Sequence, residues 1–320
     1  MSHQLNENRT SVQMVQVSKD QAGQRIDNFL LARLKGMPKS VIYKLLRTGQ
    51  VRVNKKRIKA VYRLEEGDNV RIPPVNLRPA EAVTRAPEAL VAEVEARILL
   101  EDEFLMVINK PSGLAVHKGS GLGFGLIDVL RQSRPNAPFL ELVHRLDRET
   151  SGCILIAKQR SVLNELHELI RENQISKYYI TLLDGQLKGK GRKKIRTPIE
   201  ESRQSGQKFM RVSEQGKMAV SYFRPLRRFK DSTLVGVELE TGRTHQIRVQ
   251  SAYLGHAVLG DSRYGSHEHN REWKRRGLKR LFLHASEVSF QLPSSGRKYA
   301  VKAPLDGDLE SLLENLSGER

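Results

Sequence analysis

The stretch HRLDRETSG at residues 144–152 places one carboxylate, Asp147, between two arginines. The segment before it, residues 139–143, alternates bulky and polar side chains. The segment after it, residues 153–157, is a short apolar run that is typical of a buried strand. We therefore predict that Asp147 lies in a tight loop between two strands of a sheet. Such loops concentrate catalytic side chains, although an Arg-x-Asp-Arg string also occurs as a plain surface ion pair.

The composition indicates a globular protein that binds a polyanion. The 320 residues are 38% hydrophobic and carry a formal net charge of +19, with a pI near 10.1. Nucleic acid is the polyanion that this charge favours. No apolar run approaches the roughly 18 residues that span a bilayer, so we expect no membrane partner. The polar residues 1–10 lack the core of a secretory signal, which predicts a cytoplasmic protein, and a single cysteine, Cys153, excludes an internal disulfide.

Residues 23–75 are predicted to form a compact, strongly basic module. Apolar residues at helical spacing indicate two short helices, over 26–34 and 41–46, followed by short strands. Between residues 24 and 75 there are thirteen Lys or Arg against four acids, a net +9. We expect the basic side chains of the second helix and the turn after it to follow one phosphate track. They are Lys39, Lys44, Arg47, Arg52, Lys55, Lys56 and Arg57.

The remaining chain divides around a proline-rich segment. Residues 1–22 are expected to be a flexible N-terminus, and residues 76–96 an extended linker. Residues 97–320 then combine helical spacing with many strand patterns, which predicts one α+β domain. Within it, the glycine-containing basic run at 188–196 predicts a mobile loop that reaches for phosphates. The strand patterns lie at 104–108, 178–183, 218–223, 233–239, 288–292 and 299–301, and the helical patterns at 162–170, 244–254 and 309–316.

Five segments of the large domain resemble the RluA-type pseudouridine synthases. They are NKPSG with the following VH (residues 109–117), the Asp147 motif, KYY (177–179), TGRTHQIR (241–248) and RLFLHA (280–285). The basic module resembles the alpha-L RNA-binding domain that precedes the catalytic domain in the ribosomal RNA members of this family. The resemblance implies a mixed, largely antiparallel sheet with flanking helices, and isomerisation of uridine to pseudouridine in large-subunit (23S) ribosomal RNA.

The same resemblance implies roles for individual residues. Asp147 matches the catalytic carboxylate, Arg248 the arginine that pairs with it, and Tyr179 the tyrosine that stacks on the target uracil. A neighbouring arginine favours the ionised form that a catalytic carboxylate needs. Arg145 matches the arginine that helps to fill the gap left by the extruded nucleotide, and Leu283 an apolar wall of the pocket.

His245, which flanks the motif arginine, is a further candidate for substrate binding. The resemblance leaves open whether Asp147 attacks C1′ of the ribose or first removes a proton from C2′. It implies no cofactor and no metal, and we expect a monomer.

Three alternatives stay open on the sequence. The target could be another structured RNA such as transfer RNA, or the chain could be a non-catalytic RNA-binding factor of ribosome assembly. The triplet His267–His269 suggests a metal-dependent nuclease, but such sites gather several ligands, whereas this triplet stands among Asn270, Arg271 and Lys274 in a polar segment. A chelator separates these possibilities, because isomerisation should survive EDTA.

Overall fold

The computed structural model of the chain describes residues 11–34, 36–75, 85–118, 123–204 and 207–318. The chain divides into two compact units, residues 1–84 and 85–320. Within the described ranges, no helix is long and apolar enough to cross a membrane.

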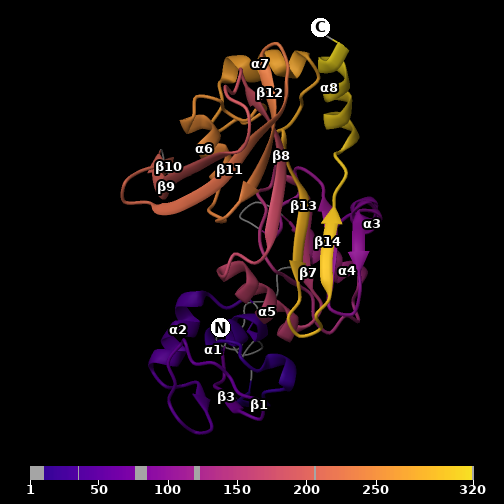
Figure 1. Ribbon diagram of the computed structural model, residues 1–320. Helices are drawn as coiled ribbons and strands as arrows, with labels where there is room; N and C mark the ends of the chain where they lie inside the picture. The colour runs from indigo at the N-terminus through magenta and orange to yellow at the C-terminus, as the bar shows by residue number, and fades with distance from the viewer. Residues whose placement is uncertain (1–10, 35, 76–84, 119–122, 205–206, 319–320) are drawn as a thin grey trace, which may run out of the picture. The chain divides into compact units, whose positions relative to one another are not determined.

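The first unit packs two helices against a three-stranded antiparallel sheet (Figure 1). Its elements are β1 (Gln13–Gln16), η1 (Lys19–Gln21), α1 (Ile26–Arg33), α2 (Lys39–Arg47), β2 (Arg52–Val53) and β3 (Asn69–Ile72), and the strand order is β1-β3-β2. The two predicted helices are confirmed. The apolar faces of both helices, represented by Ile26 and Ile42, are fully buried in one core with Val70 of β3.

The prediction of a flexible N-terminus over 1–22 is wrong for its second half. Residues 13–16 form β1, which pairs with β3 through the register Gln13↔Ile72 to Gln16↔Asn69. The strand is only four residues long and Val15 is its one buried side chain, while Met14 is exposed, so the sequence signal for it is weak. Residues 1–10 lie outside the described part of the chain.

The second unit is built on one eleven-stranded sheet, whose order is β10-β9-β11-β12-β8-β13-β7-β5-β4, with β14 beside β13 and β6 beside β7. Its strands are β4 (Ile98–Glu101), β5 (Leu105–Lys110), β6 (Glu141–Leu142), β7 (Ser151–Ala157), β8 (Ser176–Asp184), β9 (Lys193–Gln204), β10 (Gln207–Val212), β11 (Lys217–Arg228), β12 (Ser232–Leu239), β13 (Leu283–Gln291) and β14 (Lys298–Lys302). All neighbouring strands are antiparallel except β7 and β13, which are parallel. The sheet is therefore mixed and largely antiparallel, and the predicted α+β class is confirmed.

Helices cover both faces of this sheet. The helices are α3 (Glu88–Ala96), α4 (Leu126–Ser133), α5 (Arg160–Arg171), α6 (Gln246–Tyr253), α7 (His267–Arg275) and α8 (Gly307–Gly318). Along β7, Ile154 and Ile156 pack with α4 on one face, while Leu155 and Ala157 pack with α5 on the other. A strand buried on both faces reads as a continuous apolar run, which explains the pattern after the Asp147 motif.

Two predictions about connections are wrong. The segment 76–96 is not a linker throughout, because residues 88–96 form α3, which packs Val94 into the core against α4. The basic run 188–196 is not a loop throughout, because β9 begins at Lys193 and pairs with β11. The basic residues at 193–196 are thus fixed on a strand.

Gly152 is the point where the Asp147 loop enters the sheet. Its φ is +106°, and a Cβ atom here would lie 2.2 Å from the carbonyl oxygen of Ala285 on the parallel strand β13. We expect Gly152→Ala to lower the free energy of unfolding by about 3 kcal/mol, from overpacking and left-handed strain together. Chemical denaturation measures this loss. The matched control is Gly277→Ala, where φ is +101° and a Cβ meets nothing within 4 Å, so about 1 kcal/mol is expected; equal losses would contradict the account.

Candidate active site

A pocket of about 160 Å³ in the second unit brings six predicted site residues together. It lies beside the loop between β6 and β7, the end of β12, the N-terminus of α6 and the first residue of β13. The predicted residues that line it are Arg145, Asp147, Tyr179, His245, Arg248 and Leu283. They come from four segments spread over residues 145–283, so their convergence depends on the fold of the whole unit.

Two side-chain nitrogens lie close to the Asp147 carboxylate inside this pocket, and one of them donates a hydrogen bond to it. Nη1 of Arg248 lies 3.3 Å from its Oδ2, and Nε2 of His245 lies 3.7 Å from the same oxygen. The Asp147 side chain keeps 17% exposure, so its carboxylate is paired and still open to the pocket. A carboxylate in this setting can act as a nucleophile or as a base.

Arg248 is held in place on its other side by Asp261. Nε and Nη2 of Arg248 donate to the two carboxylate oxygens of Asp261 at 2.7 and 2.8 Å, and the Asp261 side chain is fully buried. Burial disfavours both charges, but their mutual hydrogen bonds and attraction outweigh it. The pKa of Arg248 is therefore raised and the pKa of Asp261 lowered. The arginine is a fixed cation whose Nη1 faces Asp147.

His245 precedes α6 with a left-handed backbone, at φ +54°. Such a conformation is uncommon outside glycine and is found at sites where a side chain must be aimed. Nδ1 of its ring lies 2.7 Å from the hydroxyl of Tyr264. Burial lowers the pKa of His245, an effect that the charge of Asp147 opposes, so the ring is neutral near pH 7.

Tyr179 and Leu283 form an apolar wall of the pocket. Tyr179 lies on β8 and is 8% exposed, and Leu283 lies on the adjacent strand β13 in the same core layer. Burial, followed by the negative charge of Asp147, raises the pKa of the Tyr179 hydroxyl, which therefore stays neutral. Tyr178, the preceding residue, is half-buried and points elsewhere, against Gly236 of β12. Arg145 is exposed at the pocket.

The loop that carries Asp147 is fastened by the NKPSG segment. Nζ of the fully buried Lys110 donates to the carbonyl oxygens of Arg148, Pro111 and Leu114 at 3.0, 2.8 and 2.8 Å. Burial lowers the pKa of Lys110 to about 7, and the charges of Glu149 and Asp147 oppose this shift. The NKPSG segment resembles a family motif, and the hydrogen bonds of Lys110 to backbone carbonyl oxygens give this segment a structural role.

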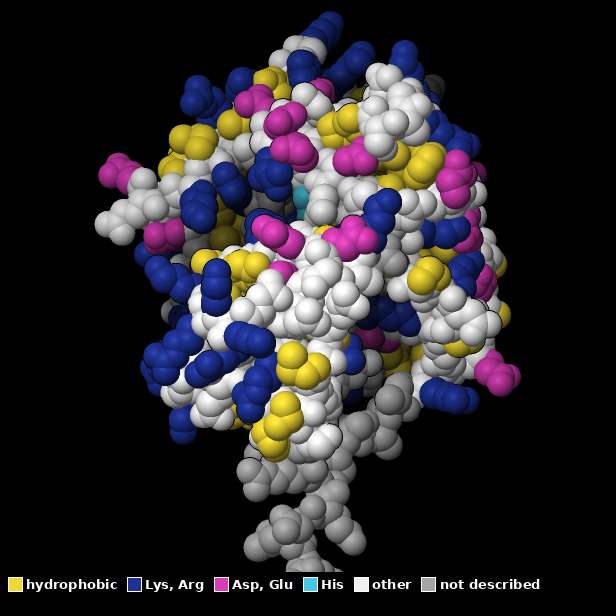
Figure 2. All heavy atoms as spheres, turned by 90° about the horizontal axis from the view of Figure 1, so that it is seen from below, with side chains coloured by type: hydrophobic (Ala, Val, Ile, Leu, Met, Phe, Trp, Pro, Cys, Tyr) yellow, Lys and Arg dark blue, Asp and Glu magenta, His cyan; other side chains and the backbone are white. Residues whose placement is uncertain are grey.

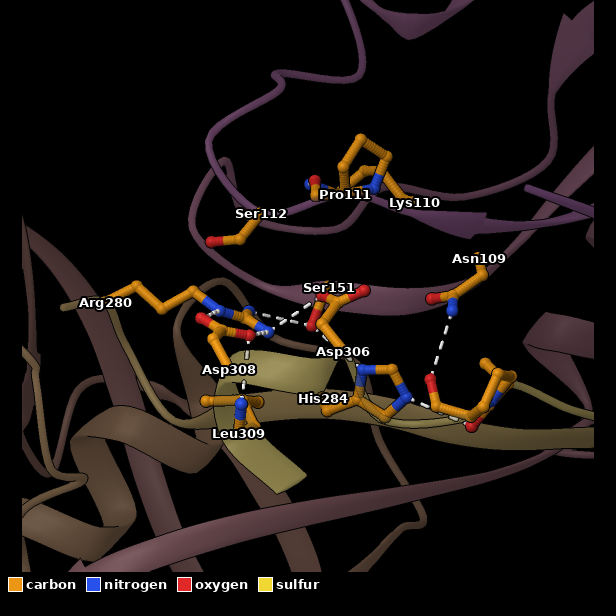
Figure 3. Close-up of polar contacts among 12 residues, drawn as sticks. Asn109, Lys110, Pro111, Ser112, Ser151, Arg280, His284, Asp306, Asp308 and Leu309 are labelled. Carbon is orange, nitrogen blue, oxygen red and sulfur yellow. Dashed lines mark hydrogen bonds and ion pairs between the residues drawn. The ribbon is translucent and has the colours of Figure 1, made fainter. Parts of the chain in front are cut away.

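A polar cluster fastens the other end of the loop, where β7 begins. Figure 3 shows Arg280 and His284 reaching Ser151 from two sides. Oγ of Ser151 lies 2.8 Å from Nδ1 of His284 and accepts from Arg280 at 3.0 Å, and Arg280 also donates to Asp306 at 2.8 Å. Because Ser151 and His284 are fully buried, this cluster sets the register between β7 and β13 and does not face substrate.

In the first unit, the seven predicted RNA-binding residues are all exposed. Lys44 and Arg47 of α2 and Arg57 of the following turn line one groove, together with Tyr43 and Lys59. The remaining four lie on α2, on β2 and in the turn after β2, but do not line this groove: Lys39, Arg52, Lys55 and Lys56. The groove thus gathers three of the predicted cations, and the sequence did not predict Lys59 or Tyr43.

His144, which also lines the pocket, provides a pH test of this loop. Its Nε2 accepts the N–H of Leu155 at 3.3 Å, and burial, followed by the charge of Lys177, lowers the pKa of His144 from 6.5 to about 4. Between these pH values the unfolded chain binds more protons than the folded one, so stability falls as the pH drops from 6.5 to 4. We expect this residue to contribute about 2 kcal/mol to the fall, less than the full shift because the ring borders the open pocket.

Urea unfolding of wild type and of His144→Gln at pH 6.5 and 4.5 isolates this contribution, because the other histidines are common to both proteins. The variant should lose less stability on acidification. Parallel losses in the two proteins would contradict the assigned protonation state.

Comparison with known proteins identifies the family. The model described as "RNA pseudouridylate synthase" matches residues 104–253, and the S4 domain model matches residues 24–70. Ribosomal large subunit pseudouridine synthase C of Escherichia coli (strain K12) is 49% identical over 314 residues, covering 97% of this chain and 98% of that protein. The chain belongs to the RNA pseudouridylate synthase family. The namesake protein of Pasteurella multocida (strain Pm70) is 47% identical, covering 97% of this chain and 95% of its own length.

A solved structure of the pseudouridylate synthase family supports the fold. Human RNA pseudouridylate synthase domain containing 4 is similar with a TM-score of 0.58 and 26% identity, over 72% of this chain and 96% of that one. The predicted order, an alpha-L type S4 domain followed by a synthase domain, is confirmed. Asp261 and Tyr264, which border the site, were not predicted, because each is a single polar residue whose partner is distant in sequence.

Proposed function

We propose that this family member isomerises uridine to pseudouridine in large-subunit ribosomal RNA. The observation that carries the proposal is the pairing of Asp147 with Arg248, at 3.3 Å, in a pocket that also contains Tyr179. The relatives that match nearly the whole chain are ribosomal large subunit pseudouridine synthases, which supports the choice of RNA.

The reaction needs few groups. The bond from N1 of uracil to C1′ of the ribose breaks, the base rotates, and C5 bonds to C1′ while the C5 proton is lost and N1 gains one. No water enters and no group leaves, so the second carboxylate that glycoside hydrolysis uses is not required. Asp147 acts as the nucleophile at C1′ or as the base at C2′, and both routes use the carboxylate that pairs with Arg248 at 3.3 Å.

The other pocket residues receive the extruded nucleotide. Tyr179 offers an aromatic face to the uracil, and Leu283 closes the apolar wall beside it. Extruding a nucleotide costs a few kcal/mol, and Arg145, exposed at the pocket, offsets this cost by filling the gap in the RNA. His245 completes the polar side of the pocket next to Asp147.

The S4 domain supplies non-specific affinity for RNA. Its seven exposed cations, from Lys39 to Arg57, meet backbone phosphates, while the shape of the RNA selects the uridine. Figure 2 shows Lys and Arg side chains over much of the face in view, with fewer acidic side chains between them, as the net charge of +19 requires. We propose that the protein works as a monomer in the cytoplasm, where ribosomes are assembled, and that it needs no cofactor.

Incubation with transcribed RNA tests the proposal. Purified protein should form pseudouridine in large-subunit ribosomal RNA, detected by chemical mapping, and should do so equally with and without EDTA. Conversion of transfer RNA alone would identify the alternative substrate class. Binding without conversion would identify an assembly factor, and cleavage that EDTA stops would identify a nuclease.

A further inference from the structure

One loop, residues 260–265 between α6 and α7, touches both residues whose nitrogens lie close to Asp147. Asp261 binds Arg248, and Tyr264 binds His245. The loop is rigid, because the side chain of Asn270 on α7 accepts the N–H of Gly260 and donates to the carbonyl oxygen of Asp261, at 3.1 and 2.8 Å. Neither Asp261 nor Tyr264, as the structure describes them, forms a hydrogen bond with Asp147, so any effect on the reaction is indirect.

On the arginine side, the bonds to Asp261 fix the direction in which Nη1 points. A guanidinium presents its donors as a planar fork. Asp261 occupies the edge formed by Nε and Nη2, at 2.7 and 2.8 Å, and Nη1 then lies 3.3 Å from Asp147. Oδ1 of Asp261 also accepts the backbone N–H groups of Arg263 and Tyr264, so its carboxylate cannot rotate freely.

On the histidine side, the tautomer of the ring depends on the two groups that flank it, the Asp147 carboxylate and the Tyr264 hydroxyl. The Tyr264 hydroxyl accepts the N–H of Met210 at 3.2 Å and lies 2.7 Å from Nδ1 of His245. Because a carboxylate only accepts hydrogen bonds, the ring next to Asp147 is stabilised with its proton on Nε2, which makes Nδ1 the acceptor of the Tyr264 proton. Burial raises the pKa of Tyr264, which keeps this proton on the hydroxyl.

We propose that Asp261 and Tyr264 are positioning residues for the isomerisation, each occupying one edge of its partner so that the opposite N–H group points at Asp147. This inference rests on the proposed function and deepens it. The centre of the Tyr264 ring also lies 4.9 Å from the centre of the Phe209 ring on β10, so the hairpin of β9 and β10 packs against Tyr264.

Kinetics of the full chain on transcribed RNA separates positioning from stability. We expect Asp261→Asn to lower kcat about 100-fold, as a misplaced catalytic group does, and Tyr264→Phe about tenfold, the loss of one hydrogen bond. KM and RNA affinity should stay within about twofold. In a His245→Gln background, Tyr264→Phe should cause no further loss, because the two residues act as one unit.

The matched control is Asp102→Asn in the turn between β4 and β5. Asp102 resembles Asp261 in accepting two backbone N–H groups and pairing with an arginine, Arg297, but it lies outside the pocket. Its variant should lose thermal stability and keep kcat. A kcat of Asp261→Asn or Tyr264→Phe within about threefold of wild type, in a protein that is itself active, would overturn the inference and leave the proposed function intact.

Nitrogen-15 NMR of the His245 ring gives a second readout that needs no catalysis. The wild type should show a proton on Nε2 and an unprotonated, hydrogen-bonded Nδ1, and Tyr264→Phe should shift this pattern toward a mixture of tautomers. An Nδ1 proton in the wild type would refute the assigned direction of the hydrogen bond. This result stands even if Asp261→Asn fails to fold or the wild type proves inactive on ribosomal RNA.

Discussion

Asp147→Asn is expected to abolish pseudouridine formation, with a loss on the order of 10⁴-fold or more. The amide has the shape of the carboxylate but can neither attack C1′ nor accept a proton from C2′. The pocket should persist, because Asp261 still holds Arg248 and Lys110 still fastens the loop. RNA affinity should therefore stay close to that of the wild type. Single-turnover conversion and a binding titration on the same transcript measure both quantities.

The control for this variant is Glu149→Gln, two residues along the same loop. The Glu149 side chain is 48% exposed and pairs with Arg148 at the surface, outside the pocket. Its variant should convert uridine at the wild-type rate. Measurable turnover by Asp147→Asn, or an equal loss in the control, would remove Asp147 from the mechanism.

Neutralising the basic groove of the S4 domain has the second-largest expected effect. Changing Lys39, Lys44, Arg47 and Arg57 to glutamine removes four exposed charges, three of which line the groove. Each lost phosphate contact lowers the slope of log K against log salt by about 0.7–0.9, so the slope should fall by about three. Affinity near physiological salt should fall at least tenfold. RNA-binding titrations over a range of salt concentrations measure both.

A charge-matched control separates a specific groove from a general basic surface. Lys274, Arg275, Lys298 and Lys302 are exposed on the second unit, and changing them to glutamine alters the net charge equally. The control should keep most of the salt slope. The same loss of slope in both variants would mean that RNA contacts are spread over the protein and that the groove has no special role.

The sequence predicted the residues that meet in the pocket, but it did not predict the residues that hold them in place. Asp147, Tyr179 and Arg248 each belong to a segment that resembles a motif of the pseudouridine synthases. Strand alternation also places Tyr179 on one face of its sheet. Asp261 and Tyr264 carry no such signal. Their partners are 13 and 19 residues away in sequence, and nothing local indicates that a loop carboxylate meets a helix arginine.

The failed predictions have physical reasons as well. Residues 88–96 contain alanine and glutamate next to prolines, which is typical of linkers, yet tertiary packing of Val94 makes this segment a helix. The run at 188–196 has the charge of a mobile loop, but Ile195 and Thr197 are buried in the sheet, so the adjacent basic residues at 193, 194 and 196 are carried on β9. The composition of such a segment reflects its many exposed side chains. It does not reveal the few buried side chains that pack the segment against the rest of the domain.

The most direct test of the central claim is a map of pseudouridines in ribosomal RNA from cells with and without this protein. Deletion should remove specific pseudouridines from large-subunit RNA. Wild-type protein should restore them, and Asp147→Asn, expressed at the same level, should not. An unchanged map after deletion, or restoration by Asp147→Asn, would contradict the proposed single-carboxylate isomerase.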